Sequence, residues 1–324
     1  MNPHSTRRRA GLRLLVPILT LGLVAAACGG DDSDADTTEV PAETTAPPAE
    51  TTAPPAEGPT IRVRGQDFSE AITIAEVYGQ YLDAKGYDVE ILTPAGFRTE
   101  AIDGIRNADL DLIIDYIGGS LTALAPDGES LSDADEIMAV IGPLYAEIGG
   151  TLLDYAPAID GDAFVVRGDS EASTISDVAD LDYVFGASAQ CFERPQCFLG
   201  YTDPDVYGIE FSDTVTLEFG PLLGEALQAG EVDAVVWNDT APQIDEFGFK
   251  VLEDDLGLHP AQNIAPIVRT EVLEAYGDQL RADLDALSAM ITTEDLLAWN
   301  VETDLEFRES AAVATEWLEA NDLI

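Results

Sequence analysis

Two aromatic residues that end buried-strand patterns are the side chains of this chain best suited to a binding site. In GEVDAVVWNDT, residues 230–240, small aliphatic residues lead to Trp237, and the chain then turns polar at once. In ADLDLIIDYIGGS, residues 108–120, aliphatic residues lead in the same way to Tyr116. Ring edges next to such polar loops are expected to stay partly uncovered, so the two rings are candidates for the walls of a ligand-binding cleft. Packing of both rings in a hydrophobic core is the alternative.

Residue types that catalysis usually requires are scarce. The chain holds 2 histidines, and only His259 lies outside the first 28 residues, so neither a Ser-His-Asp triad nor a histidine metal site can be assembled. The sequence has no phosphate-binding glycine loop. Among 62 acidic residues, chance pairs of carboxylates carry no weight as an acid/base site. We therefore expect a protein that is not an enzyme and that uses no metal and no cofactor.

The charge of the chain is strongly negative. A formal net charge of −47 excludes nucleic acid as a partner, since phosphate contacts need a basic surface. The negative field favours the arrival of a cation, although acid spread along a whole chain is also typical of solubility or of a salty habitat.

Alternating strand and helix patterns position the two rings. Residues 61–64 and 87–92 read as strands, 70–84 as a helix, and another helix from about 99 leads into the strand that ends at Tyr116. A second helix starts at Pro221, ends at Gly230 and leads into the strand that ends at Trp237. This repetition predicts an α/β protein with parallel sheets and two similar lobes. Ligands of such sheets bind outside the carboxyl ends of the strands.

The first 60 residues do not read as part of the fold. An arginine-rich start, a short apolar run and the letters AAAC predict an export signal over 1–28, with Cys28 as the lipidated first residue of a lipoprotein. A plain secretory signal is the alternative. Residues 29–60 are rich in Thr, Ala, Pro and Glu, which predicts a disordered linker that holds the remainder away from a membrane.

Two further cysteines lie close together in AQCFERPQC. In an oxidising compartment we expect Cys191 and Cys197 to form a disulfide, against the alternative of two free buried thiols.

Several segments in order resemble one family, the substrate-binding lipoproteins of ABC importers for glycine betaine, choline and related osmoprotectants. The resemblance covers nearly all of 61–324 and rests on these stretches: IRVRGQDFSEAITIAEVYGQYLDAKGYDVE, ADLDLIIDYIGG, FERP, LQAGEVDAVVW, VLEDDLGLHPAQNIAPIVR and ITTEDLLAWNVETDLEFRESAAVATEWL. It implies a type II periplasmic-binding-protein fold with a cleft between two lobes. Lobe 1 would span 61–159 plus 264–324 and lobe 2 would span 160–263, joined by two crossovers and closing over the ligand as a hinge.

Family members enclose a quaternary ammonium group in four aromatic rings, and this chain matches only half of that set. Tyr116 matches the first ring and Trp237 the third, whereas the second falls on Asp162 and the fourth on Gln262. Asp162, together with Asp160, would place negative charge where a ring usually lies. In the alternative alignment, shifted by one or two places, Phe164 supplies the ring.

Three more residues follow from the resemblance as candidate ligand contacts. Gln66 follows the first strand, where family members contact ligand, and a turn-capping role is the alternative. Arg98 precedes a helix and is a candidate to hold a ligand carboxylate, or else forms an exposed salt bridge. Arg194 lies between the two cysteines and could serve in either way.

The resemblance also implies partners and a location. It predicts an extracytoplasmic protein, anchored to the cell membrane through Cys28, that delivers a small cationic or zwitterionic amine to an ABC permease and its ATPase. A ligand that is a non-quaternary amine or an amino-acid derivative stays open. So do a sensory or scaffolding lipoprotein without transport and an enzyme built on a similar two-lobe scaffold.

Overall fold

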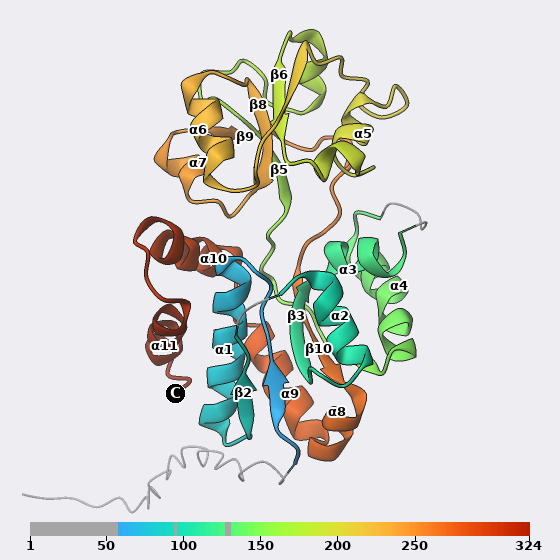
Figure 1. Ribbon diagram of the computed structural model, residues 1–324, viewed down its shortest axis with the longest axis vertical. Helices are drawn as coiled ribbons and strands as arrows, with labels where there is room; N and C mark the ends of the chain where they lie inside the picture. The colour runs from blue at the N-terminus through green and yellow to red at the C-terminus, as the bar shows by residue number, and fades with distance from the viewer. Residues whose placement is uncertain (1–57, 94–95, 127–130) are drawn as a thin grey trace, which may run out of the picture. The chain divides into compact units, whose positions relative to one another are not determined.

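Two five-stranded sheets with flanking helices make up the part of the chain that the structure describes. The computed structural model describes residues 58–93, 96–126 and 131–324, and Figure 1 shows the arrangement of their elements. The first sheet has, in spatial order, β2 (Val89–Ile91), β1 (Ile61–Val63), β3 (Leu112–Tyr116), β10 (Ile264–Arg269) and β4 (Gly150–Leu152). The second has β7 (Asp213–Thr216), β6 (Val184–Ala187), β8 (Ala234–Asn238), β5 (Asp162–Val166) and β9 (Lys250–Val251).

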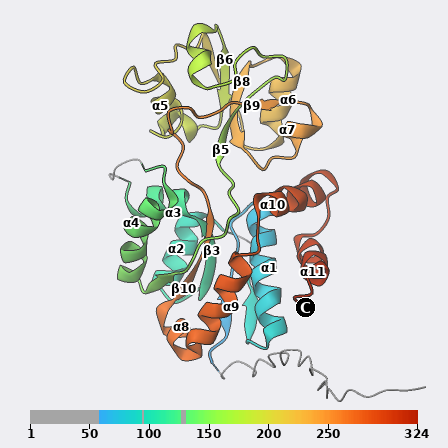
Figure 2. The same cartoon turned by 180° about the vertical axis from the view of Figure 1, so that it is seen from behind.

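Most of the helices in the described ranges belong to the first sheet. Those of the first are α1 (Ser69–Lys85), α2 (Arg98–Arg106), α3 (Ile117–Leu124), α4 (Ala134–Glu147), α8 (Thr270–Tyr276), α9 (Asp278–Ser288), α10 (Thr293–Asn300), a π-helical turn (Val301–Leu305) and α11 (Ser310–Ala320). Those of the second are two 3₁₀ turns (Ser176–Asp180 and Cys191–Glu193), α5 (Phe198–Thr202), α6 (Pro221–Ala229) and α7 (Gln243–Glu246). Figure 2 shows α8 and α9 on the side of the first sheet turned away in Figure 1. None of the helices within the described ranges has the length and apolarity of a membrane span.

Local sequence signals explain where the predicted helices begin and end. The helix α1 ends before Gly86, which takes a left-handed conformation with φ of 95° that favours glycine. The helix α6 has Pro221 in its first turn and ends before Gly230 at φ of 72°, as the sequence predicts.

Both sheets are mixed, and the expectation of purely parallel sheets is wrong in this respect. In each, three neighbouring strands run parallel, while β10 lies antiparallel to β3 and β4, and β5 lies antiparallel to β8 and β9. The strands β5 and β10 are the ones whose preceding segments come from the other sheet (Figure 1). Such a strand enters its sheet from the end at which the parallel strands finish, so its direction is reversed.

The two sheets repeat one topology. The strands β2, β1, β3, β10 and β4 correspond in order and direction to β7, β6, β8, β5 and β9. The two-lobe α/β fold that the sequence predicts is confirmed. The exact lobe boundaries stay a prediction; strands of the first sheet lie within 61–152 and 264–269, and those of the second within 162–251.

Each sheet has a hydrophobic core on both faces. On the first sheet, Leu112, Ile114 and Tyr116 face the core built with α1 and α8 to α11, while Ile113 faces the core built with α2 to α4. Alternation along a strand therefore decides on which side of the sheet each candidate residue acts.

Candidate functional site

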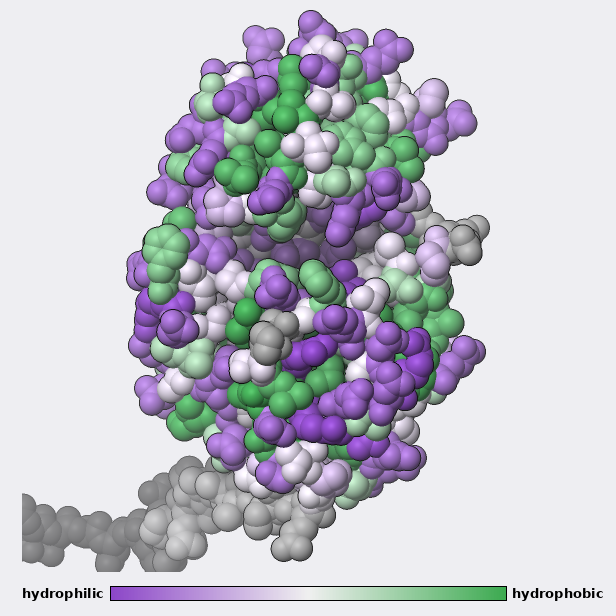
Figure 3. All heavy atoms as spheres, viewed as in Figure 1, coloured by the Kyte–Doolittle hydropathy of each residue, from purple (hydrophilic) through white to green (hydrophobic). Residues whose placement is uncertain are grey.

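The site that the fold positions lies at the carboxyl ends of β3 and β8. Tyr116 is the last residue of β3 and is buried on the α1 face of its sheet. Its hydroxyl group donates a hydrogen bond to Oε1 of Glu70 at 2.6 Å. Its ring stacks on Phe68 with 5.9 Å between ring centroids, and Phe68 is exposed. Figure 3 shows a hollow between the elements of the two sheets, bordered largely by hydrophilic residues.

Glu70 is the centre of this arrangement, and the sequence analysis did not single it out. It lies in the first turn of α1 and is only 2% exposed. Besides Tyr116, Thr240 Oγ1 donates to Glu70 Oε2 at 2.8 Å and Asn300 Nδ2 donates to the same oxygen at 2.6 Å. An acidic residue in the first turn of a helix is ordinary, because it favours the helix dipole, so nothing in the sequence separates Glu70 from a capping residue.

A second carboxyl group lies against Glu70. Asp160 lies in the segment between the two sheets, and its Oδ1 is 2.7 Å from Thr240 Oγ1, the hydroxyl oxygen that also contacts Glu70. Burial and the nearness of Glu70 raise the pKa of Asp160 well above its ordinary value. Burial raises the pKa of Glu70 as well, although the hydrogen bonds from Tyr116, Asn300 and Thr240 lower it.

Residues of four chain segments meet at this carboxyl pair. Glu70 and Asn300 belong to helices of the first sheet, Asp160 to a crossover, and Thr240 to the loop after β8 of the second sheet. Asn300 Nδ2 also donates to the carbonyl oxygen of Thr240 at 3.2 Å. The pair is thus a point of contact between the two lobes.

Gln66 and Arg98 meet at Asp115, on the opposite face of β3 from Tyr116. The buried Asp115 accepts hydrogen bonds from Gln66 Nε2 at 2.7 Å, from Arg98 Nε at 2.9 Å and from Ser120 Oγ at 2.7 Å. The guanidinium group of Arg98 therefore has a carboxylate partner within the protein. A ligand role for Gln66 or Arg98 stays a prediction, and their contacts here are structural.

Gln262 lies at the crossover that leads into β10. Its Oε1 accepts a hydrogen bond from the backbone N–H of Gly119 at 3.0 Å, and its carbonyl oxygen accepts from the N–H of Asp160 at 3.3 Å. Gln262 thus connects the loop after β3 to the crossover beside the carboxyl pair, and a ligand contact of Gln262 stays a prediction.

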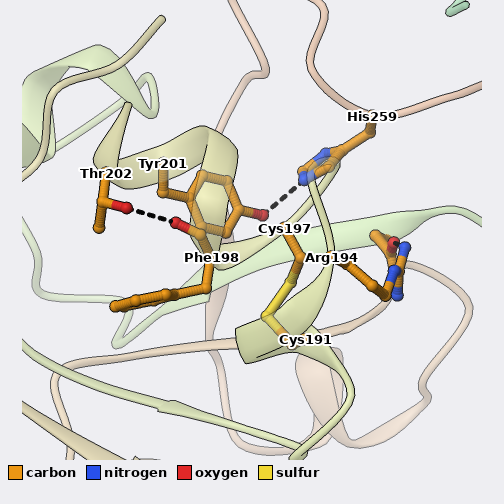
Figure 4. Close-up of a disulfide and its surroundings, with 8 residues drawn as sticks. Cys191, Arg194, Cys197, Phe198, Tyr201, Thr202 and His259 are labelled. Atoms are coloured by element: carbon orange, nitrogen blue, oxygen red, sulfur yellow. Dashed lines mark hydrogen bonds and ion pairs between the residues drawn. A yellow bond between two sulfur atoms is a disulfide. The ribbon is translucent and has the colours of Figure 1, made fainter. Parts of the chain in front are cut away.

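Asp162 and Arg194 form an ion pair with each other. Asp162 begins β5, and Arg194 lies in the loop closed by the predicted Cys191–Cys197 disulfide, which is present in the structure with 5.3 Å between its Cα atoms (Figure 4). Because Arg194 balances the charge of Asp162, this carboxylate is less available to a cation than those of Glu70 and Asp160. That Asp162 or Arg194 contacts ligand stays a prediction.

The disulfide gives a stability prediction. Replacing both Cys191 and Cys197 by alanine is expected to lower the free energy of unfolding by about 2 kcal/mol, the low end for a disulfide, because the closed loop is short. Urea denaturation of the variant and of the parent protein, the latter with and without reductant, measures this difference. An unchanged midpoint in all three samples would mean that the bond contributes nothing.

Trp237 is not the counterpart of Tyr116 in the second lobe. Its side chain lies on the opposite face of the second sheet from the residue that is that counterpart. In the paired strands Tyr116 is opposite Ile264 and Asn238 is opposite Asp162, so Asn238, one residue further on, is the counterpart of Tyr116. The alignment of Tyr116 with Trp237 is therefore wrong by one residue, and a shift of one residue moves a side chain to the opposite face. The indole is 2% exposed and packs with residues of α6 and α7. A ligand contact of Trp237 stays a prediction without support in this packing.

The alternative ring, Phe164, is also in a core. It is fully buried and packs edge-on against Tyr201 with 5.1 Å between centroids. Phe68, which the sequence analysis did not single out, is the aromatic residue with exposed surface beside Tyr116.

Two lobes of the same topology, with polar residues at the strand ends, define a periplasmic-binding-protein fold. Residues 59–320 match the family described as the substrate binding domain of ABC-type glycine betaine transport systems, and the chain belongs to this family. It is accordingly a substrate-binding protein of an ABC-type transport system.

Curated relatives and solved structures agree with this family. The chain is 24% identical over 281 residues to a glycine-betaine-binding protein of Pseudomonas aeruginosa, covering 82% of this chain and 89% of that protein. It is 24% identical over 272 residues to the carnitine transport binding protein OpuCC of Listeria monocytogenes, covering 81% and 87%. The crystal structure of a glycine betaine/carnitine/choline ABC transporter protein superimposes with a TM-score of 0.72 at 21% identity, covering 81% of this chain and 99% of that chain.

Proposed function

We propose that this protein captures a small cationic or zwitterionic amine between its two lobes and delivers it to an ABC permease with its ATPase, outside the cytoplasm. The role is binding and handover without chemical change of the ligand. The relatives named above support the ligand class, since their names specify glycine betaine and carnitine.

The observation that carries this proposal is a buried pair of carboxyl groups without a positive partner. None of the ion pairs formed within the described ranges includes Glu70 or Asp160. Buried charges in proteins are usually paired, because removing an ionised group from water is costly. A cationic ligand would supply the missing charge at the strand ends, where ligands of this fold bind.

Ring surface supports the same ligand class. Phe68 stacks on Tyr116 and keeps part of its ring exposed next to the carboxyl pair. A ring face attracts a cation by about 0.5 to 2 kcal/mol and also accommodates the methyl or methylene groups that amines carry.

Anchoring and location are proposed from the sequence. Cys28 and the linker over 29–60 lie almost wholly outside the described residues. A lipid on Cys28 would keep the binding domain near the permease. Labelling with a radioactive fatty acid, and loss of that label in Cys28→Ala, tests the anchor.

The proposed ligand class is tested by a binding screen. Glycine betaine, choline, carnitine, dimethylglycine, putrescine and single amino acids are added in thermal-shift assays, and any ligand present at a hundred times its dissociation constant is expected to add about 2.7 kcal/mol to the stability. Asp160→Asn is expected to weaken the best binder at least tenfold, because about 1.4 kcal/mol of charge interaction is lost.

The matched control for this variant is Asp245→Asn, an exposed aspartate on α7 whose replacement should leave the dissociation constant unchanged. If no amine in the panel stabilises the protein, the proposed ligand class is wrong. If Asp160→Asn binds as tightly as the parent protein, the carboxyl pair is not the cation site.

A further inference from the structure

The contacts of Thr240 with the carboxyl pair are all satisfied as hydrogen bonds when the pair carries a proton. Its hydroxyl oxygen lies 2.8 Å from Glu70 Oε2 and 2.7 Å from Asp160 Oδ1, and it also accepts a hydrogen bond from Asn238 Nδ2 at 3.0 Å. A hydroxyl group has one hydrogen, so it can donate to only one of the two carboxyl groups. The second carboxyl group satisfies this geometry when it is protonated and donates to the hydroxyl oxygen.

Asn300 provides an unused acceptor beside the pair. Its Nδ2 faces Glu70 Oε2 and the carbonyl oxygen of Thr240, which fixes the orientation of the carboxamide group. Its Oδ1 is buried and accepts no hydrogen bond from the part of the chain that the structure describes, while the residue is 2% exposed. Buried polar atoms usually have partners, and an acceptor without one is a place for a ligand that brings a donor.

The position of Asn300 in the chain sets this residue apart from an ordinary helical one. It is the last residue of α10 and the N-terminal neighbour of the π-helical turn Val301–Leu305. Single π-helical turns inside helices are frequent at functional sites, because they redirect side chains at some cost to the regular hydrogen bonding.

The charged surroundings of the pair are negative. Asp239, in the loop after β8, adds negative potential at Asp160, and the phenol of Tyr116 faces Glu70. The nearby Asp162 and Asp115 are neutralised by Arg194 and Arg98, respectively. Without ligand, therefore, a proton is the species that relieves the repulsion between Glu70 and Asp160.

We infer that Glu70, Asp160 and Asn300 form a subsite for an ammonium group that carries N–H bonds, and that such a ligand displaces the proton shared by Glu70 and Asp160. This inference rests on the proposed function and narrows its ligand class. The ammonium group donates N–H bonds to the two carboxylates and to Oδ1 of Asn300. A quaternary ammonium group has no N–H to offer, so it would leave Oδ1 of Asn300 without a donor and would give neither carboxylate a further hydrogen bond.

The exchange balances in charge. The ligand enters as a cation, the proton leaves the carboxyl pair for the solvent, and the pair becomes two carboxylates next to one ammonium group. No covalent bond of the ligand is made or broken. Simple amines enter in this form at neutral pH, as the ordinary lysine pKa of about 10.4 indicates.

Matched ligands test the requirement for N–H. Binding of N,N-dimethylglycine is compared with that of glycine betaine, and binding of N,N-dimethylethanolamine with that of choline, by isothermal titration calorimetry. Each pair differs by one methyl group that replaces one N–H. In whichever of the two ligand pairs binds, the dimethyl ligand is expected to bind at least about tenfold more tightly than the trimethyl ligand. This ratio corresponds to about 1.4 kcal/mol of binding free energy.

The same titrations measure how many protons are released when the ligand binds. Repeating them in phosphate and in Tris, which differ in ionisation enthalpy, is expected to reveal release of close to one proton per ligand. Below the pKa of the ligand-free pair, the dissociation constant should fall by about tenfold for each unit of pH increase. The parent protein alone suffices for this measurement, so it does not depend on the folding of a variant.

A variant locates the proton. Glu70→Gln keeps the size of the side chain and removes its charge, so proton release and the pH dependence are both expected to disappear and the affinity for the amine to fall. Glu274→Gln, at an exposed position on α8, is the matched control and should behave as the parent protein does.

The outcomes separate this inference from the proposed function. Tighter binding of the trimethyl ligands, equal binding of both, or binding without proton release overturns the inference while leaving the protein an amine-binding protein. Unchanged proton release in Glu70→Gln overturns it as well. Absence of binding for all four ligands and for the wider panel counts against the proposed function itself.

Discussion

Trp237→Ala is expected to lower the free energy of unfolding by about 3 to 5 kcal/mol, the range for truncation of a large buried aromatic side chain. The indole is 2% exposed and lies in a core shared with Leu223, Leu227 and Ile244. A Cβ atom added at Gly224 would come within 2.7 Å of the ring, so α6 packs directly against it. Urea denaturation measures the loss of stability.

The matched control is Phe219→Ala, which removes an aromatic ring that is 58% exposed and should change stability by no more than about 0.5 kcal/mol. Amine binding by Trp237→Ala, measured below its unfolding transition, should stay within a few-fold of the parent protein. Unchanged stability together with weakened binding would instead make Trp237 the wall of the cleft that the sequence predicts.

The two-lobe fold was predictable from sequence because its signals are local and periodic. Helix α1, helix α6 and the two strands after them follow from the spacing of apolar residues and from Gly86, Pro221 and Gly230. The face on which Trp237 lies was not predictable, because two short apolar runs can be aligned in more than one register. The strand pairing of β3 with β10 and of β8 with β5 decides the register, and those partners are distant in sequence.

The candidate site was harder to predict than the fold. The sequence predicts three of the residues that lie at or beside the carboxyl pair, because they fall at a strand end or in a crossover: Tyr116, Asp160 and Gln262. Glu70 and Asn300 belong to helices, where an acid and an amide are unremarkable. Only the folded chain shows that they are buried against each other, because 230 residues separate them.

The similarity of the two lobes that the sequence predicts extends to two equivalent aspartates, each of which forms ion pairs with arginine. Asp111 accepts hydrogen bonds from Arg62 Nε at 2.6 Å and from Arg269 Nε at 2.8 Å. Asp233, at the same position before β8, accepts from Arg167 Nη2 at 2.9 Å. In both lobes this aspartate precedes the central strand by one residue and also accepts a backbone N–H of a neighbouring chain segment, of Arg62 at 3.1 Å in one lobe and of Val184 at 3.0 Å in the other.

Asp111→Ala is expected to lower the free energy of unfolding by about 3 to 5 kcal/mol, more than Asp233→Ala, for which about 1.5 kcal/mol is expected. The side chain of Asp111 is 1% exposed and forms ion pairs with two arginines. The side chain of Asp233 is 27% exposed, so solvent screens its ion pair with Arg167. Urea denaturation of the two variants under the same conditions measures both losses of stability. Equal losses in Asp111→Ala and Asp233→Ala would contradict the prediction.

The difference in free energy of unfolding between the parent protein and Asp111→Ala is expected to become smaller at acidic pH. Burial alone would raise the pKa of Asp111, but hydrogen bonds from Arg62 and Arg269 outweigh it, and the pKa lies below its ordinary value. A carboxyl group whose pKa is lower in the folded state stabilises the fold above its unfolded pKa of about 3.9, and this contribution is lost as pH falls through the folded value. The opposite trend is expected of Glu70 and Asp160, whose raised pKa values make ionisation at higher pH unfavourable to the folded state. The free energy of unfolding is therefore measured against pH for Asp111→Ala and for the variants of Glu70 and Asp160. Opposite trends distinguish a carboxylate that is paired with arginine in the protein from a carboxyl pair that lacks a positive partner.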